Sequence, residues 1–457
     1  MPVLVETATP YGLTAHRVRV YVTANPVGRP PARSGDVVRT ALREAGYPTA
    51  FAFFVEVSGG HTRQDVASLD LAIALGALAA HAPGIVSPHA LARVLVLGCL
   101  TRDGAIAHIP GLLAMTLALR TQGVTTVILP RTADWMRPLL DGVTVVFAAS
   151  LRDAITQLMT EPRLPDPTPP ASPRAAPVAP APLDPALDLA LRVAAAGGHH
   201  LLLAAPPGTD LRPLADHVGA HQPPLSRDDI LAISARHEIA AACHAPVRTR
   251  PTLALPHGID RWALLGTPRR PGHLLLPHLG VLLLDDLRGY APDVRSLLRA
   301  SVTQGRLDIP DAPGSLDGVT IPLTTIVLAP LSSCPCGYDG HPGPRCRCTA
   351  AAIATYRRDL PRDLLSLFDL VVEVPRTTTG PAPPTRPGPR PLTPRRVAPL
   401  FRVTPSARER LALLTDIATR DGILRIAASV ADVADRDWIL DVDVEWALRH
   451  LRLDRVG

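Results

Sequence analysis

A short stretch in the middle of the chain has the form of a phosphate-binding loop. Residues 205–215 read APPGTDLRPLA and follow three leucines. A working loop of this type reads G-x-x-x-x-G-K-[ST]: backbone N–H groups surround the phosphates, the Lys contacts the terminal phosphates and the hydroxyl binds Mg²⁺. The defining positions are here Ala205, Asp210, Leu211 and Arg212. The stretch is therefore either a chance turn or a phosphate-binding loop that has lost its chemistry.

Four of the six cysteines lie close together, at Cys334, Cys336, Cys346 and Cys348. They form the pattern C-x-C-x₉-C-x-C, with His341 between the two pairs. Four thiolates gathered by a Gly- and Pro-rich turn can bind Zn²⁺ tetrahedrally, and structural zinc sites often use four cysteines. Free thiols and a redox pair are the alternatives. We interpret Cys99 and Cys243, in apolar surroundings, as core residues.

Two Pro-rich stretches separate three segments that must position these residues. Residues 161–185 and 376–398 are predicted linkers, because Pro lacks a backbone donor and restricts the residue before it. We expect an N-terminal domain over 1–160, a core over 186–375 and a helical C-terminal part over 399–457. The predicted fold class is α/β.

The hydrophobic patterns predict elements in each segment. In the first we expect strands at 17–24 and 51–58 and helices at 36–46, 69–82 and 111–123, with short buried strands in VLVLGCL, TVILP and TVVFAA. In the second we expect a strand in LLLAA, a helix over about 211–219 and strands at 280–287 and 319–330. The tail is predicted to be helical over 406–435 and again near VDVEWALRHL.

Composition limits the classes of function. The chain has 457 residues, of which 47% are apolar, and a net charge of +6. All of its 47 basic residues are Arg, so no reaction that needs a lysine can take place. The charge permits contact with nucleic acid without arguing strongly for it. We expect a cytoplasmic protein, because no signal peptide and no long apolar run is present.

The order of motifs resembles the magnesium-chelatase-like AAA+ family of the ComM/YifB type. The resemblance rests in the first segment on VRTALREAGYP, SLDLAIALGALAA and LGCLTRDGAIAHIPGLLAMTLALRTQGVTTVILP. In the core it rests on GGHHLLLAAPPGT, RRPGHLLLPHLGVLLLDDL, SLLRASVTQGRLDIP, SSCPCGYDGHPGPRCRC and LLSLFDLVVEVP. It implies a Lon-like (S5 domain 2-like) α/β N-terminal domain, an AAA+ parallel-sheet core and a helical lid. It also implies ATP and Mg²⁺ as cofactors and a hexameric ring that acts on DNA in recombination or transformation.

Carried over residue by residue, the resemblance predicts a degenerate member of this family. The family's loop G-P-P-G-T-G-K-[ST] is matched only at Pro206, Pro207, Gly208 and Thr209. Asp210 brings negative charge to the phosphate position, and Leu211 removes a charge-assisted bond worth about 1.5–3 kcal/mol. Arg212 can contact phosphate oxygens, but it stands where a Mg²⁺-binding hydroxyl is expected.

The acidic and sensor positions of the family are also altered. Asp285 keeps the metal-binding position of the second acidic strand, whereas Asp286 replaces a Glu that activates water. The sensor Asn becomes Ser332, the Arg before FDL becomes Leu367, and the lid's Ser-x-Arg pattern is incomplete at 418–420. Because phosphoryl transfer depends on nearly all of these parts, we do not expect hydrolysis. Alternatively, the two aspartates only end a strand and cap the next helix.

Two further sites follow from the resemblance. A Lon-type Ser–Lys protease is excluded, since Ser68 falls near the serine position but Leu113 stands at the lysine position. An arginine cluster lies where the family has an insert near its central pore: Arg248, Arg250, Arg261, Arg269 and Arg270. These residues are a candidate DNA contact, with an ordinary solvated surface as the alternative.

Three functions remain open on these grounds. The first is a pseudo-ATPase that forms a ring scaffold and binds DNA or a protein partner. The second is an ATPase of full or weak activity that uses Arg212 and the two aspartates. The third is a zinc-stabilised interaction module in which nucleotide has no part.

Overall fold

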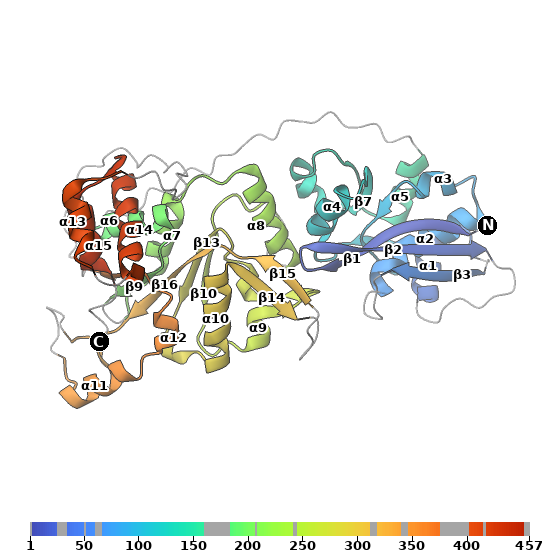
Figure 1. Cartoon of the computed structure of the whole chain (residues 1–457). Coiled ribbons are helices and arrows are strands. Elements are labelled where there is room, and N and C mark those ends of the chain that lie inside the picture. Colours follow the sequence, from blue (N-terminus) through green and yellow to red (C-terminus); the bar gives the residue numbers. More distant parts are fainter. Residues whose placement is uncertain are drawn as a thin grey trace.

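The computed structural model describes residues 2–24, 34–49, 52–59, 66–159, 183–205, 208–240, 245–310, 318–339, 346–374, 402–414 and 417–451. The predicted linkers lie outside these residues except for 183–185, as do Pro206, Pro207, Cys243 and His341. The described residues form an N-terminal part, a central part and a smaller helical part in the order of the chain (Figure 1).

A six-stranded sheet organises the N-terminal part, with the strand order β3-β2-β1-β4-β7-β8. Its strands are β1 (Val3–Tyr11), β2 (Thr14–Ala24), β3 (Phe53–Gly59), β4 (Leu95–Val96), β7 (Thr126–Pro130) and β8 (Thr144–Ala148). The first three are antiparallel, while β4, β7 and β8 continue the sheet in parallel with β1. Because strand side chains alternate between faces, the sheet supplies residues to two separate cores.

Helices cover both faces of this sheet. They are α1 (Ser34–Glu44), α2 (Val66–His81), α3 (Pro88–Leu91), α4 (Leu112–Arg120) and α5 (Leu151–Met159), with the 3₁₀ helix η2 (Arg131–Leu139). A small hairpin is formed by β5 (Cys99–Leu100) and β6 (Ile106–Ala107). Helix α2 is apolar all round and fills the core on one face, whereas α4 packs on the other.

A parallel five-stranded sheet organises the central part, with the strand order β10-β13-β16-β9-β17. Its strands are β9 (Leu201–Ala204), β10 (Thr252–Leu255), β13 (Gly280–Leu284), β16 (Thr325–Leu331) and β17 (Leu370–Glu373). Every residue of β13 is buried, as expected for a strand covered on both faces. Helices on both sides make this an AAA+ type α/β fold, and the predicted fold class is confirmed.

The other elements of the central part surround this sheet. Its helices are α6 (Pro185–Gly197), α7 (Arg212–His221), α8 (Arg227–Ile239), α9 (Arg261–Leu265), α10 (Pro292–Gln304), α11 (Ala350–Arg358) and α12 (Arg362–Leu365), with η3 (His273–Leu275) and η4 (Leu287–Gly289). Two hairpins are formed by β11 (Gly266–Thr267) with β12 (Arg270–Pro271) and by β14 (Arg306–Pro310) with β15 (Gly318–Pro322).

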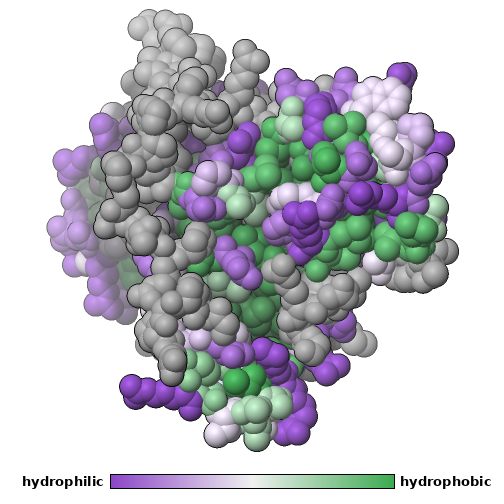
Figure 2. Space-filling model, turned by 90° about the vertical axis from the view of Figure 1, so that its left-hand side faces the viewer, coloured by the Kyte–Doolittle hydropathy of each residue, from purple (hydrophilic) through white to green (hydrophobic). Residues whose placement is uncertain are grey.

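The C-terminal part is a small helical unit that packs on α6. It contains α13 (Pro405–Ala412), α14 (Ile417–Val433) and α15 (Asp441–His450), joined by the short pair β18 (Arg402–Val403) and β19 (Trp438–Ile439). Its buried side chains share one core with α6, α7 and the central sheet. Apolar side chains also face outward at this end of the molecule (Figure 2), among them Leu413, Trp438 and Val442.

Two predicted elements are corrected by the structure. The strand expected over 319–330 is two strands, because β15 ends at Pro322, pairs with β14 and leaves only β16 in the parallel sheet. The helix expected over 406–435 is the two helices α13 and α14. Strand β1 and helix α8 were not predicted at all. Among the described residues, no helix combines the length and apolar character that a membrane span requires.

A buried carboxylate joins the N-terminal and central parts. Glu238, near the end of α8, is 1% exposed and accepts hydrogen bonds from the backbone N–H groups at the start of α4. Gly111 donates to its Oε1 at 2.9 Å, and His108 Nε2 lies 2.9 Å from the same oxygen. A negative charge at a helix N-terminus interacts favourably with the helix dipole. The β1–β2 turn adds a second contact, since Gly12 donates its N–H to Pro268 O at 2.6 Å.

We expect Glu238→Ala to lower the free energy of unfolding by about 3 kcal/mol, because buried N–H groups would lose a charged acceptor. The control is Glu409→Ala on exposed α13, which should change this free energy by less than about 0.5 kcal/mol. Urea unfolding followed by circular dichroism measures both. Equal midpoints for the two variants would contradict the role of Glu238.

Candidate functional site

The predicted phosphate loop, acidic strand end and sensor position lie along one edge of the central sheet. The loop follows β9, Asp285 follows β13 and Ser332 follows β16. The register places Ala204 opposite Leu331, so the parallel strands end at the same edge. Ligands of open α/β sheets bind outside the carboxyl ends of the strands. This edge is therefore the candidate nucleotide site.

The N-terminus of α7 already carries an anion from the chain itself. Asp210 Oδ1 accepts the backbone N–H of Arg212 at 2.9 Å, where α7 begins. In a phosphate-binding loop such N–H groups point at the phosphate. The Asp210 carboxylate uses this donor and places its charge at the helix terminus, where a phosphate would be repelled. Gly208 has a φ of +80°, a conformation that suits glycine.

The side chain at the lysine position points into the protein. Leu211 is 6% exposed and belongs to the core that α6, α7 and the C-terminal helices share. A phosphate-contacting lysine would have to leave this core to reach a ligand. Arg212 next to it is exposed.

The two aspartates after β13 differ in what they contact. Asp286 Oδ1 accepts the N–H of Arg288 at 3.0 Å and caps η4, which is the structural alternative considered for this pair. Asp285 is exposed, and its Oδ2 lies 2.9 Å from His257 Nδ1. His257 was missed in the sequence, although it follows β10, the strand beside β13. Residues that follow neighbouring parallel strands lie close together. A sequence-based prediction that β10 pairs with β13 would therefore have placed His257 near Asp285.

Ser332 lines a small cavity at the same edge. The cavity has a volume of about 150 Å³ and includes Arg357 and Glu373 in its wall. Sites for drug-sized ligands typically enclose about 300–1,000 Å³. The cavity is therefore smaller than a typical site for such a ligand. Leu367, at a position where the family has Arg, is buried in the core of the central part.

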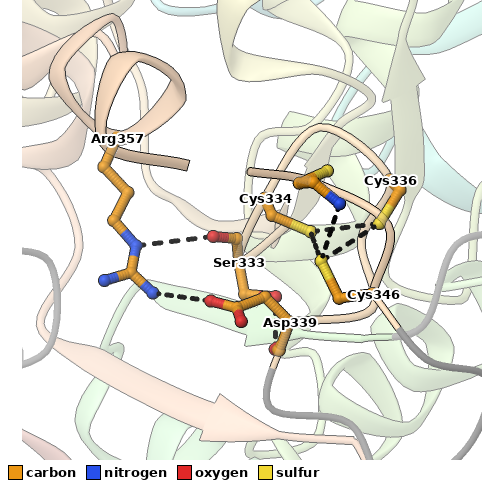
Figure 3. Close-up of polar contacts among 7 residues, drawn as sticks. Ser333, Cys334, Cys336, Asp339, Cys346 and Arg357 are labelled. Carbon is orange, nitrogen blue, oxygen red and sulfur yellow. Dashed lines mark hydrogen bonds and ion pairs between the residues drawn. The ribbon is translucent and has the colours of Figure 1, made fainter. Parts of the chain in front are cut away.

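The four cysteines after β16 converge on one point (Figure 3). Cys334 Sγ lies 3.4 Å from Cys336 Sγ and 3.6 Å from Cys346 Sγ, and the last two are 3.5 Å apart. Cys348 completes the group, whose ligand atoms all lie within 4.8 Å of one another. Disulfide sulfurs are about 2.05 Å apart, whereas ligands at 2.3 Å from a tetrahedral Zn²⁺ are separated by about 3.8 Å. The four thiols therefore fit a metal and not a disulfide.

Local hydrogen bonds hold the cysteine turn in this form. Arg357 on α11 donates to Ser333 O and to Asp339 Oδ2, and Ser333 Oγ donates to Asp339 O (Figure 3). Backbone N–H groups of Tyr338 and Arg347 lower the pKa of Cys336 to about 6, whereas desolvation and neighbouring thiols raise the pKa of Cys346 and of Cys348 in the absence of a metal. The thiolate is the form that ligates a metal.

Comparison with known proteins identifies the family to which this sequence is similar. Residues 185–381 match the family described as magnesium chelatase, subunit ChlI, and residues 32–133 match the family described as subunit ChlI of Mg-chelatase. The YifB protein of Escherichia coli is 30% identical over 194 residues, which cover 42% of this chain and 37% of YifB. Competence protein ComM of Haemophilus influenzae is 30% identical over 197 residues, with the same shares. The chain belongs to the magnesium-chelatase-like family of YifB and ComM.

A mycobacterial relative matches more of this magnesium-chelatase-like protein. The uncharacterized protein Rv2897c of Mycobacterium tuberculosis is 29% identical over 372 residues, which cover 78% of this chain and 72% of the relative. The similarity thus extends over both sheets.

The candidate DNA-contacting arginines have different environments in this magnesium-chelatase-like protein. Arg250 is half-buried and donates to the carbonyl oxygens of Leu279 and Pro223, so its guanidinium supports the fold. Arg261 and Arg270 are exposed, and Arg261 lies over the Trp262 ring at 5.8 Å. Arg248 and Arg269 are partly exposed.

The residues at the family's protease positions lie on different helices of the N-terminal part. Ser68 is near the start of α2, while Leu113 is fully buried in α4 on the other face of the sheet. The arrangement offers no nucleophile and base pair at these two positions.

Proposed function

We propose that this magnesium-chelatase-like protein is a pseudo-ATPase that acts as a scaffold or a DNA- or partner-binding subunit of an oligomeric ring. The observation that carries the proposal is the hydrogen bond from Arg212 N–H to Asp210, which gives one backbone donor at the start of α7 an acceptor within the chain. The burial of Leu211 supports it, because this apolar side chain packs in the core and offers a phosphate no charged contact. The capping role of Asp286 supports it further.

Membership of this family supports an oligomeric assembly, and we infer a ring. The exposed apolar side chains of the C-terminal part, such as Leu413 and Trp438, are suited to contact with another subunit. The proposal leaves open whether the ring contains copies of this chain alone or also an intact relative.

A DNA partner remains a prediction from the sequence. The exposed guanidinium groups of Arg261 and Arg270 are suited to phosphate contact, and Trp262 beside them is 41% exposed. Arg250 is the least available of the five arginines, because two backbone carbonyls already accept its hydrogen bonds.

We expect the purified protein to show no Mg²⁺-dependent ATP hydrolysis above that of its Asp285→Ala variant. Phosphate release measures turnover, and Asp293→Ala on α10 is the matched control for a lost carboxylate. Turnover by the unaltered protein that persists in Asp293→Ala but disappears in Asp285→Ala would contradict the proposal and favour the ATPase.

A restored loop tests whether nucleotide has any part in the function. The variant Asp210→Gly, Leu211→Lys, Arg212→Thr removes the intramolecular anion and supplies the missing lysine and hydroxyl. If the restored chain folds and binds ATP, the site was a nucleotide site that lost its chemistry. If it folds, as judged by its melting curve, and still binds none, the interaction module without nucleotide is favoured.

The cysteine group is proposed to hold structural zinc through Cys334, Cys336, Cys346 and Cys348. We expect Cys334→Ser to remove one equivalent of zinc from freshly purified, reduced protein and to lower its melting temperature, because a ligand set of three binds more weakly. Metal analysis by mass spectrometry measures the content, and Cys99→Ser is the matched control. Unchanged zinc in Cys334→Ser would rule out the site.

A further inference from the structure

A second group of possible metal ligands lies between α6 and α7, away from the cysteines. Asp188 on α6 and His217 and His221 on α7 each place one ligand atom within 4.8 Å of the other two. The two histidines are four residues apart and therefore lie on the same face of one helix. Their rings are 4.2 Å apart between centroids. Two histidines four residues apart on one helix are a common way to present two imidazoles to one ion.

The hydrogen bonds of the histidines leave ring nitrogens free to ligate. His221 Nδ1 lies 2.8 Å from the backbone oxygen of His217 and must donate there, so its Nε2 carries the lone pair. His217 Nε2 lies 2.9 Å from Asp188 Oδ1. An ion between these two side chains would take the place of this hydrogen bond and use Nε2 as its ligand, with the ring proton on Nδ1.

The side chain of His217 is buried, and that of Asp188 beside it is partly exposed. Arg192 is the other charged group that faces the cluster, and its Nη1 lies 3.9 Å from Asp188 Oδ2. That contact leaves Asp188 Oδ1 on the side of the histidines.

We propose that Asp188, His217 and His221 bind one divalent transition-metal ion. Two imidazoles and one carboxylate favour Zn²⁺, Ni²⁺, Co²⁺ or Cu²⁺ over Mg²⁺ and Ca²⁺, which prefer oxygen ligands. Asp188 is partly exposed and gives the ion access to water, while both imidazoles are buried. The ion ties α6 to α7, the helix that follows the degenerate loop. It is separate from the cysteine group, which belongs to the segment after β16.

Cobalt titration of the full chain distinguishes the two sites without removing either. Thiolate-bound Co²⁺ gives a sulfur-to-metal charge-transfer band in the near ultraviolet, and Co²⁺ bound by imidazole and carboxylate does not. We expect two equivalents of Co²⁺ per chain, of which one produces the thiolate band. His221→Ala should lose the other equivalent and keep the thiolate band unchanged.

Two further variants make the result decisive. Asp188→Asn keeps a hydrogen-bond partner for His217 and should weaken binding of the second equivalent of Co²⁺ by about tenfold or more. This variant also tests the site if His221→Ala does not fold. His237→Ala on α8 is the matched control, because it removes a largely buried histidine outside the cluster, and it should keep both equivalents. The proposal is overturned if the unaltered chain binds only the thiolate-linked equivalent, or if Asp188→Asn binds the second equivalent as tightly as the unaltered chain.

Discussion

The N-terminus of α7 can satisfy one strong anion, and in this protein the chain supplies it. The hydrogen bond from Arg212 N–H to the Asp210 carboxylate uses a donor that a phosphate would need, and it does so at the positive end of the helix dipole. A nucleotide would therefore have to displace a tethered carboxylate that is present at high effective concentration.

The neighbouring changes are consistent with this replacement. Once the phosphate position is filled, a lysine at position 211 has no anion to contact, and Leu211 instead packs in the core that joins the central sheet to the C-terminal helices. Asp286 caps η4, and Ser332 borders a cavity of about 150 Å³. These contacts support the proposal that this edge of the sheet no longer holds a nucleotide. The cysteine group beyond β16 keeps a geometry suited to a metal.

The sequence predicted β9, β13 and β16 of the central sheet, because these buried strands are continuous apolar runs, but it did not predict β10 or β17. The prediction failed where a structure depends on contacts between residues that are far apart in sequence. Pro322 divides a run that looked like one strand, and only pairing with β14 shows where the first half belongs. Glu238 was missed because helix α8 was not predicted and because its partners at the start of α4 are more than 120 residues away in the chain.

For the same reason, the sequence predicted some residues of the candidate sites and missed others. The loop residues and the cysteines are close in sequence, so their spacing made them candidates, with a chance turn and free thiols or a redox pair as the alternatives. His257 and Asp285 are 28 residues apart in sequence and meet because the parallel strands before them are neighbours. Asp188 and His217 are 29 residues apart and meet because α6 packs beside α7. Their recognition needed the register of the strands and the packing of α6 on α7.

We propose that the Asp210 carboxylate takes the place of a phosphate at the N-terminus of α7. A crystal structure of the full chain grown with saturating ADP and Mg²⁺ is the direct test. Asp210 should still accept the N–H of Arg212, and no phosphate density should lie at the N-terminus of α7. Density for a nucleotide phosphate on the N–H groups of residues 208–212, with Asp210 turned away, would contradict it.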